Sequence, residues 1–403
     1  MNQLIKEILE MQELSKDLEP SEERRNELNT ALCNYSNEFI NTLDSYPAFI
    51  NNHTIANKFS LKNGKQSFQD FLNEFNQEVH QRGIKPASGG HVGYIPGGGI
   101  FTAALGDYLA CISNEYAGMH YASPGAVAIE NELLDWMKSM FGFPKNAVGN
   151  LTSGGSIANM IALTAARDKF GVKNENITNS VIYLSEQVHH CVLKALRIIG
   201  LEDVCIRYLK LDDQHKIDPT YLEAAILKDK NKGLRPFLVI ASAGTTDTGA
   251  IDPLEVMAQL AKEHNLWYHI DGAYGGFFML CESKRSLFKG IEKADSLVID
   301  PHKGLFLPYG IGTVLIKDRE IVYKSHHYIA NYMQDAIHEK WDNPADVSPE
   351  LTKHFRGLRL WLPLQLHGLA PFVACLEEKL LLTHYFRLRL IEIGFKVGPE
   401  PDL

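Results

Sequence analysis

The sequence predicts an α/β protein with a mainly parallel, doubly wound sheet covered by helices on both faces. Between residues 148 and 316, short apolar runs alternate with segments of helical periodicity. Such alternation is typical of repeated strand–helix–strand units, whose strands run parallel. The runs are almost continuously apolar, as expected of strands buried on both faces. Polar and glycine-rich turns follow the strands, at the edge where open α/β sheets collect functional groups.

The predicted elements follow one another along the chain. An apolar stripe at helical spacing predicts a helix over residues 126–141, an alanine-rich helix follows the turn at 153–156, and a third helix extends to about residue 199. A fourth is predicted to begin with Asp252 as N-cap, Pro253 as first helical residue and Glu255 two residues on. The predicted strands are one that ends at Thr152 and the runs 181–185, 236–243, 266–271, 297–299 and 310–316.

Three segments of the chain differ in composition. Residues 1–85 predict an N-terminal helical arm, residues 86–355 a large domain, and residues 356–403 the start of a small C-terminal α+β domain with a helix and the beginning of a strand. The arm has too few apolar residues for a core of its own, so we expect it to pack on another domain or subunit. The small domain is expected to be truncated.

The composition argues against several classes of protein. Of the 403 residues, 45% are hydrophobic and 22% are charged, which is ordinary for a globular chain. The net charge of −9 argues against a general binder of nucleic acids or anionic membranes. The sequence has neither a basic, apolar leader nor an apolar run of membrane-spanning length. Its scattered cysteines lack metal-ligand spacing, which favours reduced thiols in a cytoplasmic protein without a metal site.

Two glycine-rich stretches are candidates for ligand contact. Residues 86–99 carry His91 and Tyr94 among glycines and prolines, and such a loop is either a plain connection or wraps a ligand. The Ser-Gly-Gly-Ser turn at 153–156 stands between a strand and a helix. Its glycines allow backbone N–H groups to approach an anion, and Ser156 adds a hydroxyl donor. The turn is equally compatible with a plain N-capped helix.

A lysine follows the buried strand at 297–299. The strand breaks at Asp300-Pro301, and His302 and Lys303 come next on a turn. A single lysine at such a place is more often a solvated surface charge. Asp271 also follows a predicted strand, and on its own it is as well explained as a cap or turn residue.

These groups together match what a protein must offer to pyridoxal phosphate. Lys303 supplies an amine for a Schiff base, and Asp271 supplies a carboxylate for the ring nitrogen. The turn at 154–156 supplies a site for the phosphate. Ala273 offers a small side chain beneath the ring, and His189, which alone would be read as an ordinary histidine, offers a flat group above it. Their convergence predicts a cofactor site.

The order of motifs resembles the group II pyridoxal-phosphate decarboxylases, which include aromatic amino acid and glutamate decarboxylases. The resemblance covers about residues 86–361. It implies pyridoxal-phosphate fold type I (aspartate aminotransferase-like) with a seven-stranded sheet, a homodimer with shared active sites, and decarboxylation of an L-amino acid to its amine and CO2. The motifs are Ser-Gly-Gly-Ser, Gln-x-His, Gly-Thr-Thr, Asp-x-Ala-Tyr, Asp-Pro-His-Lys, Ala122-Ser-Pro124 and Phe355-Arg-Gly-Leu-Arg-Leu-Trp361.

The resemblance also implies roles for individual residues. Lys303 forms the Schiff base, Asp271 pairs with the ring nitrogen, and His189 stacks on the ring and helps to hold the substrate. The implied cofactor-binding set is Gly154, Gly155, Ser156, His189, Thr246, Asp271, Ala273, Asp300, His302 and Lys303. The implied substrate pocket is His91, Tyr94, Ile95, Pro96 and Tyr116, with residues 116–118 reaching in from the second subunit.

The sequence departs from the aromatic amino acid decarboxylases in the loop at 334–344, which has no tyrosine to protonate the substrate Cα. We therefore predict that His338 takes this role, or that the reaction is not a simple decarboxylation. Ile95 and Gly118 are smaller than the bulky rings of those enzymes, so the substrate need not be aromatic.

Three other functions stay open on the sequence. The fold would also suit a decarboxylating aldehyde synthase, or a carbon–carbon lyase acting on phosphorylated amino alcohols. A non-catalytic scaffold is the alternative outside enzymes. A scaffold would be expected to lack Lys303 or Asp271, and both are present.

Overall fold

The computed structural model describes residues 1–51, 64–95, 97–327 and 343–403. By its internal contacts the chain divides into two compact units, Met1–Gly93 and Tyr94–Leu403. Residues 356–403 fall in the same unit as the large sheet. The three-domain division with boundaries after residues 85 and 355 stays a prediction.

The first unit is built from helices and a two-stranded antiparallel sheet. Ser21 and Ser67 begin two of its helices, since each side chain accepts a hydrogen bond from a backbone N–H of the first turn. The N-terminal segment is helical, as predicted. Its two longest helices bury none of their residues. The elements are α1 (Asn2–Ser15), η1 (Lys16–Leu18), α2 (Glu22–Thr42), η2 (Leu43–Ser45), β1 (Phe49–Ile50), α3 (Phe68–Phe75), the π-helix η3 (Asn76–His80) and β2 (Gly83–Ile84).

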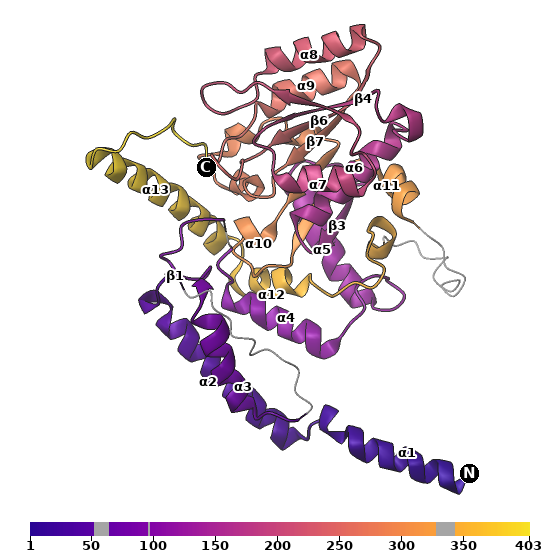
Figure 1. Ribbon diagram of the computed structural model, residues 1–403, viewed down its shortest axis with the longest axis vertical. Coiled ribbons are helices and arrows are strands. Elements are labelled where there is room, and N and C mark those ends of the chain that lie inside the picture. Colours follow the sequence, from indigo (N-terminus) through magenta and orange to yellow (C-terminus); the bar gives the residue numbers. More distant parts are fainter. Residues whose placement is uncertain (52–63, 96, 328–342) are drawn as a thin grey trace. The chain divides into compact units, whose positions relative to one another are not determined.

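The second unit is organised around a seven-stranded sheet (Figure 1). Strand β9 is antiparallel to both of its neighbours, and the other adjacent pairs are parallel. All strands of this sheet except β9 therefore point the same way, and the predicted mainly parallel, seven-stranded sheet is confirmed. In sheet order the strands are β3 (Val148–Thr152), β9 (Gly312–Ile316), β8 (Ser296–Ile299), β7 (Trp267–Asp271), β6 (Arg235–Ser242), β4 (Ser180–Ser185) and β5 (Cys205–Leu209).

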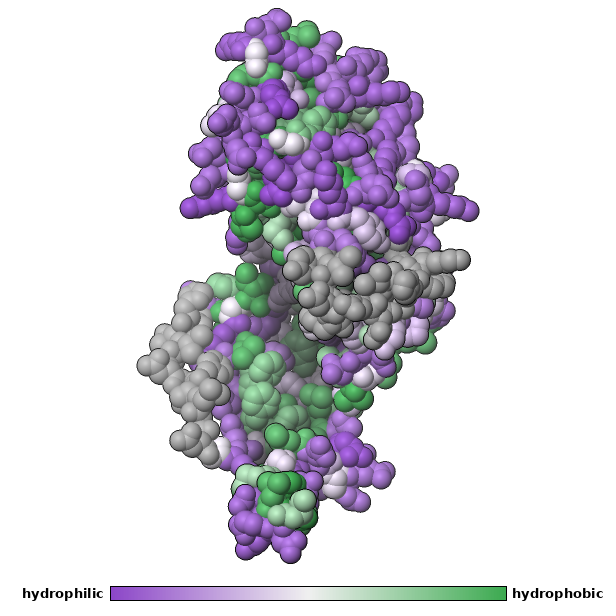
Figure 2. Space-filling model, turned by 90° about the vertical axis from the view of Figure 1, so that its right-hand side faces the viewer, coloured by the Kyte–Doolittle hydropathy of each residue, from purple (hydrophilic) through white to green (hydrophobic). Residues whose placement is uncertain are grey.

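Helices cover both faces of this sheet, as the alternation predicted. Tyr268 and Ile270 of β7 pack into one core cluster with α5, α8 and α9, while Trp267 packs into the other with α6, α7 and α11. Figure 2 shows hydrophilic side chains over the upper end of this unit, where α8 and α9 lie. The helices are α4 (Phe101–Ser113), α5 (Pro124–Met140), α6 (Gly155–Lys169), α7 (His190–Ile198), α8 (Pro219–Asn231), α9 (Leu254–His264), α10 (Pro301–Gly304), α11 (Arg319–His326), α12 (Leu358–His367) and α13 (Ala370–Glu392).

The described part of the second unit also contains short 3-10 helices. They are η4 (Asn174–Asn176), η5 (Gly276–Leu280), η6 (Arg285–Phe288), η7 (Ile291–Lys293) and η9 (Pro344–Val347). Within the described ranges, no helix has the length and apolar composition needed to cross a membrane.

Two local predictions were wrong. Asp252 does not cap α9, because its buried carboxyl instead accepts hydrogen bonds from the backbone N–H groups of Ile217 (2.8 Å) and Ser242 (2.7 Å). Residues 393–403, all of them described, form no strand. Asp402 there accepts a hydrogen bond from the backbone N–H of Ile251 and pairs with Lys216, so these contacts hold an irregular segment in place.

Strand β5 was not predicted. It lies at the edge of the sheet, and its residues are less buried than those of the central strands. Its sequence, Cys-Ile-Arg-Tyr-Leu, mixes polar and apolar residues, so it lacks the continuous apolar run that marks a strand buried on both faces.

Candidate active site

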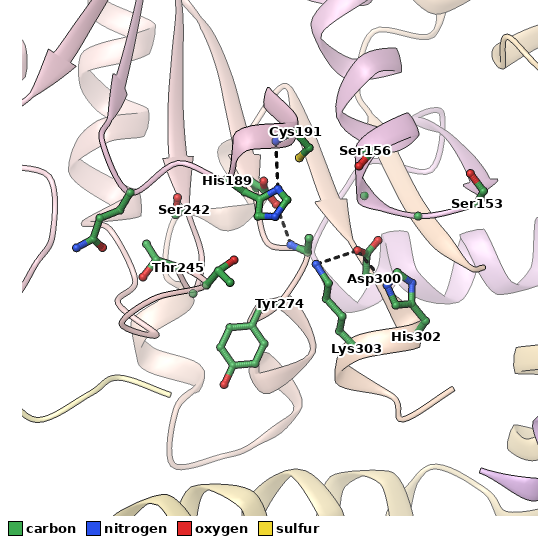
Figure 3. Close-up of a pocket in the computed structure, with 17 residues that line it drawn as sticks. Ser153, Ser156, His189, Cys191, Ser242, Thr245, Tyr274, Asp300, His302 and Lys303 are labelled. Atoms are coloured by element: carbon green, nitrogen blue, oxygen red, sulfur yellow. Dashed lines mark hydrogen bonds and ion pairs between the residues drawn. The ribbon is translucent and has the colours of Figure 1, made fainter. Parts of the chain in front are cut away.

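One pocket of the second unit gathers the predicted cofactor residues. Its cavity of about 420 Å³ falls within the roughly 300–1,000 Å³ usual for small-molecule sites. Figure 3 shows its side chains converging. They come from the carboxyl ends of β3, β4, β6, β7 and β8 and from the segments that follow these strands, at one edge of the sheet. The lining residues are Ser153, Gly154, Gly155, Ser156, Gln187, His189, Cys191, Ser242, Gly244, Thr245, Thr246, Asp271, Ala273, Tyr274, Asp300, His302 and Lys303.

The amine of Lys303 is held beside a buried carboxyl. Lys303 lies on α10, just past the end of β8, and its Nζ is 3.2 Å from Oδ2 of Asp300. Nε2 of His302 lies 3.7 Å from the same oxygen. Asp300 is only 1% exposed, so burial raises the pKa of its carboxyl, an effect opposed by Lys303 and then by His302. The Lys303 side chain remains partly accessible from the pocket.

The carboxyl of Asp271 is fixed from two sides at the end of β7. Its Oδ1 accepts a hydrogen bond from the backbone N–H of Ala273 at 3.1 Å, and its Oδ2 accepts one from Nδ2 of Asn159 at 3.3 Å. Each carboxylate oxygen has a second acceptor site. A protonated ring nitrogen inside the pocket therefore has an anchored, buried carboxylate to pair with.

The turn before α6 fits a phosphate group. Gly154 has φ +153°, a conformation that other residues rarely adopt. A Cβ at Gly155 would lie 2.8 Å from Oδ2 of Asp300, so the backbone there passes close to that carboxyl. The first N–H groups of a helix have no carbonyl partners within it, and its dipole favours an anion at this end. Ser156, in the first turn of α6, lines the same pocket.

His189 is the N-cap of α7, and Figure 3 shows its ring projecting into the pocket. Its Nδ1 accepts a hydrogen bond from the backbone N–H of Cys191 at 3.2 Å. The neutral imidazole therefore carries its hydrogen on Nε2, which stays available as a donor. Ala273 is 8% exposed and supplies the small side chain expected beneath a cofactor ring.

The predicted substrate residues are not brought to this pocket. Tyr94, Ile95 and Tyr116 are absent from its lining, and the hydroxyl of Tyr116 donates to the carbonyl of Leu351 at 2.6 Å. Of the remaining predicted residues, His91 belongs to the first unit, and Pro96 and His338 lie outside the described residues.

The loop that carries two of these residues adjoins the Lys303 turn. A Cβ at Gly97 would collide with the carbonyl oxygens of His302 and Leu307, so the two loops pack backbone to backbone. Tyr94 (φ +62°) and Ile95 (φ +51°) both have left-handed backbone conformations, which are unusual for bulky and for β-branched residues. Such strain is common at functional sites.

Several pocket residues were missed as candidates by the sequence reasoning. The signal that would have found them is their position in the sequence, since each lies at the end of a strand or in the turn or helix start that follows one. The thiol of Cys191 is one, and burial together with the nearby Asp271 raises its pKa to about 12, so it stays protonated. The other missed lining residues are Ser153, Gln187, Ser242, Gly244, Thr245 and Tyr274.

Fold and site together define a class of protein. A lysine after β8, a carboxylate at the end of β7 and an anion site before α6 at one edge of such a sheet form the arrangement expected of a pyridoxal-phosphate enzyme of fold type I. Residues 58–394 match the family described as the pyridoxal-dependent decarboxylase conserved domain. The chain belongs to this family.

Relatives and solved structures agree with this assignment. The chain is 33% identical over 376 residues to an aromatic-L-amino-acid decarboxylase of Bacillus atrophaeus, covering 92% of this chain and 78% of the relative. It is 29% identical to tyrosine decarboxylase 2 of Narcissus pseudonarcissus, covering 80% of this chain and 67% of the relative. Its fold is similar to that of Oryza sativa TDC with PLP and tryptamine, with a TM-score of 0.88, 23% identity, and coverage of 95% of this chain and 82% of the other.

A second solved structure has the same fold. It is the 4-hydroxyphenylacetaldehyde synthase of Rhodiola rosea, with a TM-score of 0.84, 22% identity, and coverage of 94% of this chain and 82% of the other. Pyridoxal phosphate is the cofactor of the family, and amino acid decarboxylation is its reaction. The predicted family, fold type, cofactor and reaction class are confirmed.

Proposed function

We propose that the protein decarboxylates an aromatic L-amino acid to its amine and CO2, with Lys303 as the residue that attaches pyridoxal phosphate. The observation that carries the proposal is the convergence of Lys303, Asp271 and the 154–156 turn on one pocket. The aromatic substrate class is supported by relatives named as aromatic-L-amino-acid, tyrosine and tryptophan decarboxylases.

The cofactor would be held by three contacts. The N–H groups at the start of α6 and the hydroxyl of Ser156 would bind the phosphate. Asp271 would accept a hydrogen bond from the ring nitrogen. His189 would stack on one face of the ring and Ala273 would lie against the other, with His302, Asp300 and Thr246 at the pocket wall.

The cofactor, when bound, supplies a protonated aromatic ring that accepts the electron pair left behind by CO2. Asp271 keeps the ring nitrogen protonated, because a buried carboxylate interacts strongly with a cation that is shielded from water. Lys303 would be the residue whose amine holds the cofactor covalently, and Oδ2 of Asp300 lies 3.2 Å from that amine. His189 donates through Nε2 to orient the substrate.

Two features of the proposal depend on the loop at 334–344. We propose His338 as the donor that returns a proton to the substrate Cα, since the loop contains no tyrosine. The same absence favours an aldehyde-forming decarboxylation as the second candidate function. Amine and aldehyde products are separated directly by chromatography of the reaction mixture.

We also propose that the protein is a homodimer with shared active sites and that it acts in the cytoplasm. Helix α1 exposes a stripe of apolar side chains that includes Leu4, Ile8 and Met11. Figure 2 shows apolar side chains gathered at the bottom of the view, where α1 lies. Monomeric proteins rarely expose such a stripe. Tyr116 and its neighbours would complete the partner's pocket. Sedimentation at about twice the 45.2 kDa of one chain is expected, and Ile8→Glu should weaken the dimer.

The first test is spectroscopic and chemical. The purified protein with added pyridoxal phosphate should show an absorption band at about 320–430 nm that Lys303→Ala removes, as expected for a covalently attached cofactor. Tyrosine, tryptophan and other L-amino acids are then supplied in turn, and CO2 and organic product are measured. CO2 with an aromatic amine supports the proposal. Turnover by Lys303→Ala at the wild-type rate would overturn it.

A further inference from the structure

Three residues of β7 line up on the face of the sheet that α6 covers. Side chains two apart on a strand point to the same face, so Trp267, His269 and Asp271 form a row. Trp267 is 3% exposed, His269 is fully buried, and Asp271 is the member that reaches the pocket. Two partners from other elements join the row, Asn159 from α6 and Ser296 from β8, and both are fully buried.

These five residues form one continuous hydrogen-bonded chain that ends on Asp271. Nε1 of Trp267 donates to Oγ of Ser296 at 2.8 Å, and the same Oγ lies 2.8 Å from Nδ1 of His269. Nε2 of His269 lies 2.7 Å from Oδ1 of Asn159. Nδ2 of Asn159 donates to Oδ2 of Asp271 at 3.3 Å.

The chemistry of the groups fixes the direction of every bond. An ionised Asp271 only accepts, so Asn159 must turn its NH2 group toward that carboxylate. The second hydrogen of this NH2 points to Sγ of Cys191 at 3.5 Å, which uses the amide fully. Oδ1 of Asn159 then faces His269 and requires a donor there, so His269 carries its hydrogen on Nε2.

The other end of the chain agrees with this assignment. A neutral His269 with a hydrogen on Nε2 has an acceptor at Nδ1, which the hydroxyl of Ser296 satisfies as donor. The oxygen of Ser296 is then free to accept from Trp267, as observed. Burial lowers the pKa of His269 to about 4, although the negative charge of Asp271 acts in the opposite direction and raises it. The ring therefore stays neutral at ordinary pH.

We propose that His269 is a positioning residue for the cofactor, which it serves by fixing the Asn159 amide so that the carboxylate of Asp271 stays aimed at the ring nitrogen. The role rests on the proposed pairing of Asp271 with that nitrogen. A neutral His269 suits this role, because a positively charged side chain at position 269 would compete with the cofactor ring for the carboxylate of Asp271.

The orientation of the Asn159 amide depends on His269. Without a donor at position 269, the Asn159 amide has no reason to keep its oxygen turned away from Asp271. A rotated amide would put its oxygen beside the carboxylate, and two facing acceptors would turn that carboxylate away from the ring nitrogen. Loss of His269 should therefore weaken cofactor binding and not merely loosen the fold.

The experiment compares variants in the binding of pyridoxal 5′-phosphate to apoprotein, by titration of the absorption band. His269→Phe removes the donor and is expected to raise the dissociation constant by about tenfold or more, since a buried acceptor loses its partner. In His269→Gln the amide nitrogen reaches the position of Nε2, so binding should be largely restored. Tyr268→Phe is the matched control. It removes a buried hydrogen bond to the carbonyl of Leu254 on the opposite face of β7 and should leave affinity within about twofold.

A second measurement does not depend on any variant folding. In 15N NMR spectra of histidine-labelled wild-type apoprotein, His269 should show the neutral tautomer with hydrogen on Nε2. A hydrogen on Nδ1 in the wild type would overturn the inference. So would a folded His269→Phe that binds the cofactor as tightly as the wild type. If the wild type itself bound no cofactor, the proposed pairing of Asp271 would fail first, and this inference with it.

Discussion

Replacing Gly155 by alanine is expected to damage the cofactor site more than the fold. A Cβ at this position would lie 2.8 Å from Oδ2 of Asp300 and 3.3 Å from Cβ of Ala273. Asp300 is buried and paired with Lys303, so it has little room to retreat. The first turn of α6 must then move away by a few tenths of an ångström, and it carries the N–H groups that would hold the phosphate.

The effect of Gly155→Ala has two parts, a loss of folding free energy and a loss of binding free energy for the cofactor. Overpacking of a tight site typically costs about 1–3 kcal/mol of folding free energy. The loss of one hydrogen bond to a charged group costs about 1.5–3 kcal/mol of binding free energy, which is roughly 10- to 150-fold in the dissociation constant. We therefore expect Gly155→Ala to bind pyridoxal phosphate at least about tenfold more weakly, while the apoprotein still folds.

Calorimetry and absorption titration of the same samples separate the two costs. Gly171→Ala is a control for backbone strain, because Gly171 has φ +61° and a Cβ there would meet nothing within 4 Å. Gly171→Ala should lower the unfolding temperature and leave cofactor affinity unchanged. A Gly155→Ala protein with wild-type affinity would refute the reasoning, because it would mean that the phosphate does not depend on the position of this turn.

Three further predictions concern Asp271, Asp252 and His338. Asp271→Asn should bind pyridoxal phosphate more weakly and lose most activity, because the ring nitrogen loses its anionic partner; titration and CO2 release measure both. Burial raises the pKa of Asp252 to about 6, above its unfolded value, so a destabilising charge is present above that pH and is lost as the pH falls toward 4. Wild type should therefore gain up to about 3 kcal/mol of unfolding free energy relative to Asp252→Asn over that range, measured by urea denaturation at several pH values. His338→Phe should slow product formation without changing cofactor affinity; an unchanged rate and product would rule out His338 as the proton donor.

Much of the cofactor site was accessible from the sequence because its residues stand at strand ends. Asp271, Lys303 and the 154–156 turn each follow an apolar run, and the run itself identifies the edge of the sheet where they must meet. The residues of the substrate pocket could not be predicted in this way. Tyr94 and Tyr116 were inferred from resemblance to a family, and neither lines the pocket in the single chain.

Local sequence patterns are enough to predict the alternation of strands and helices, the glycine turn that begins α6, and the chemical groups at the ends of β7 and β8. These depend on local periodicity and turn chemistry, which short segments encode. The folded structure shows what no local pattern predicts, namely that Asp252 binds two distant backbone segments instead of capping a helix. It alone joined Ser296, His269 and Asn159 to Asp271. Such partners lie on different elements far apart in the chain, and no local pattern records which buried polar groups the packing of α6 on the sheet will bring within hydrogen-bonding distance.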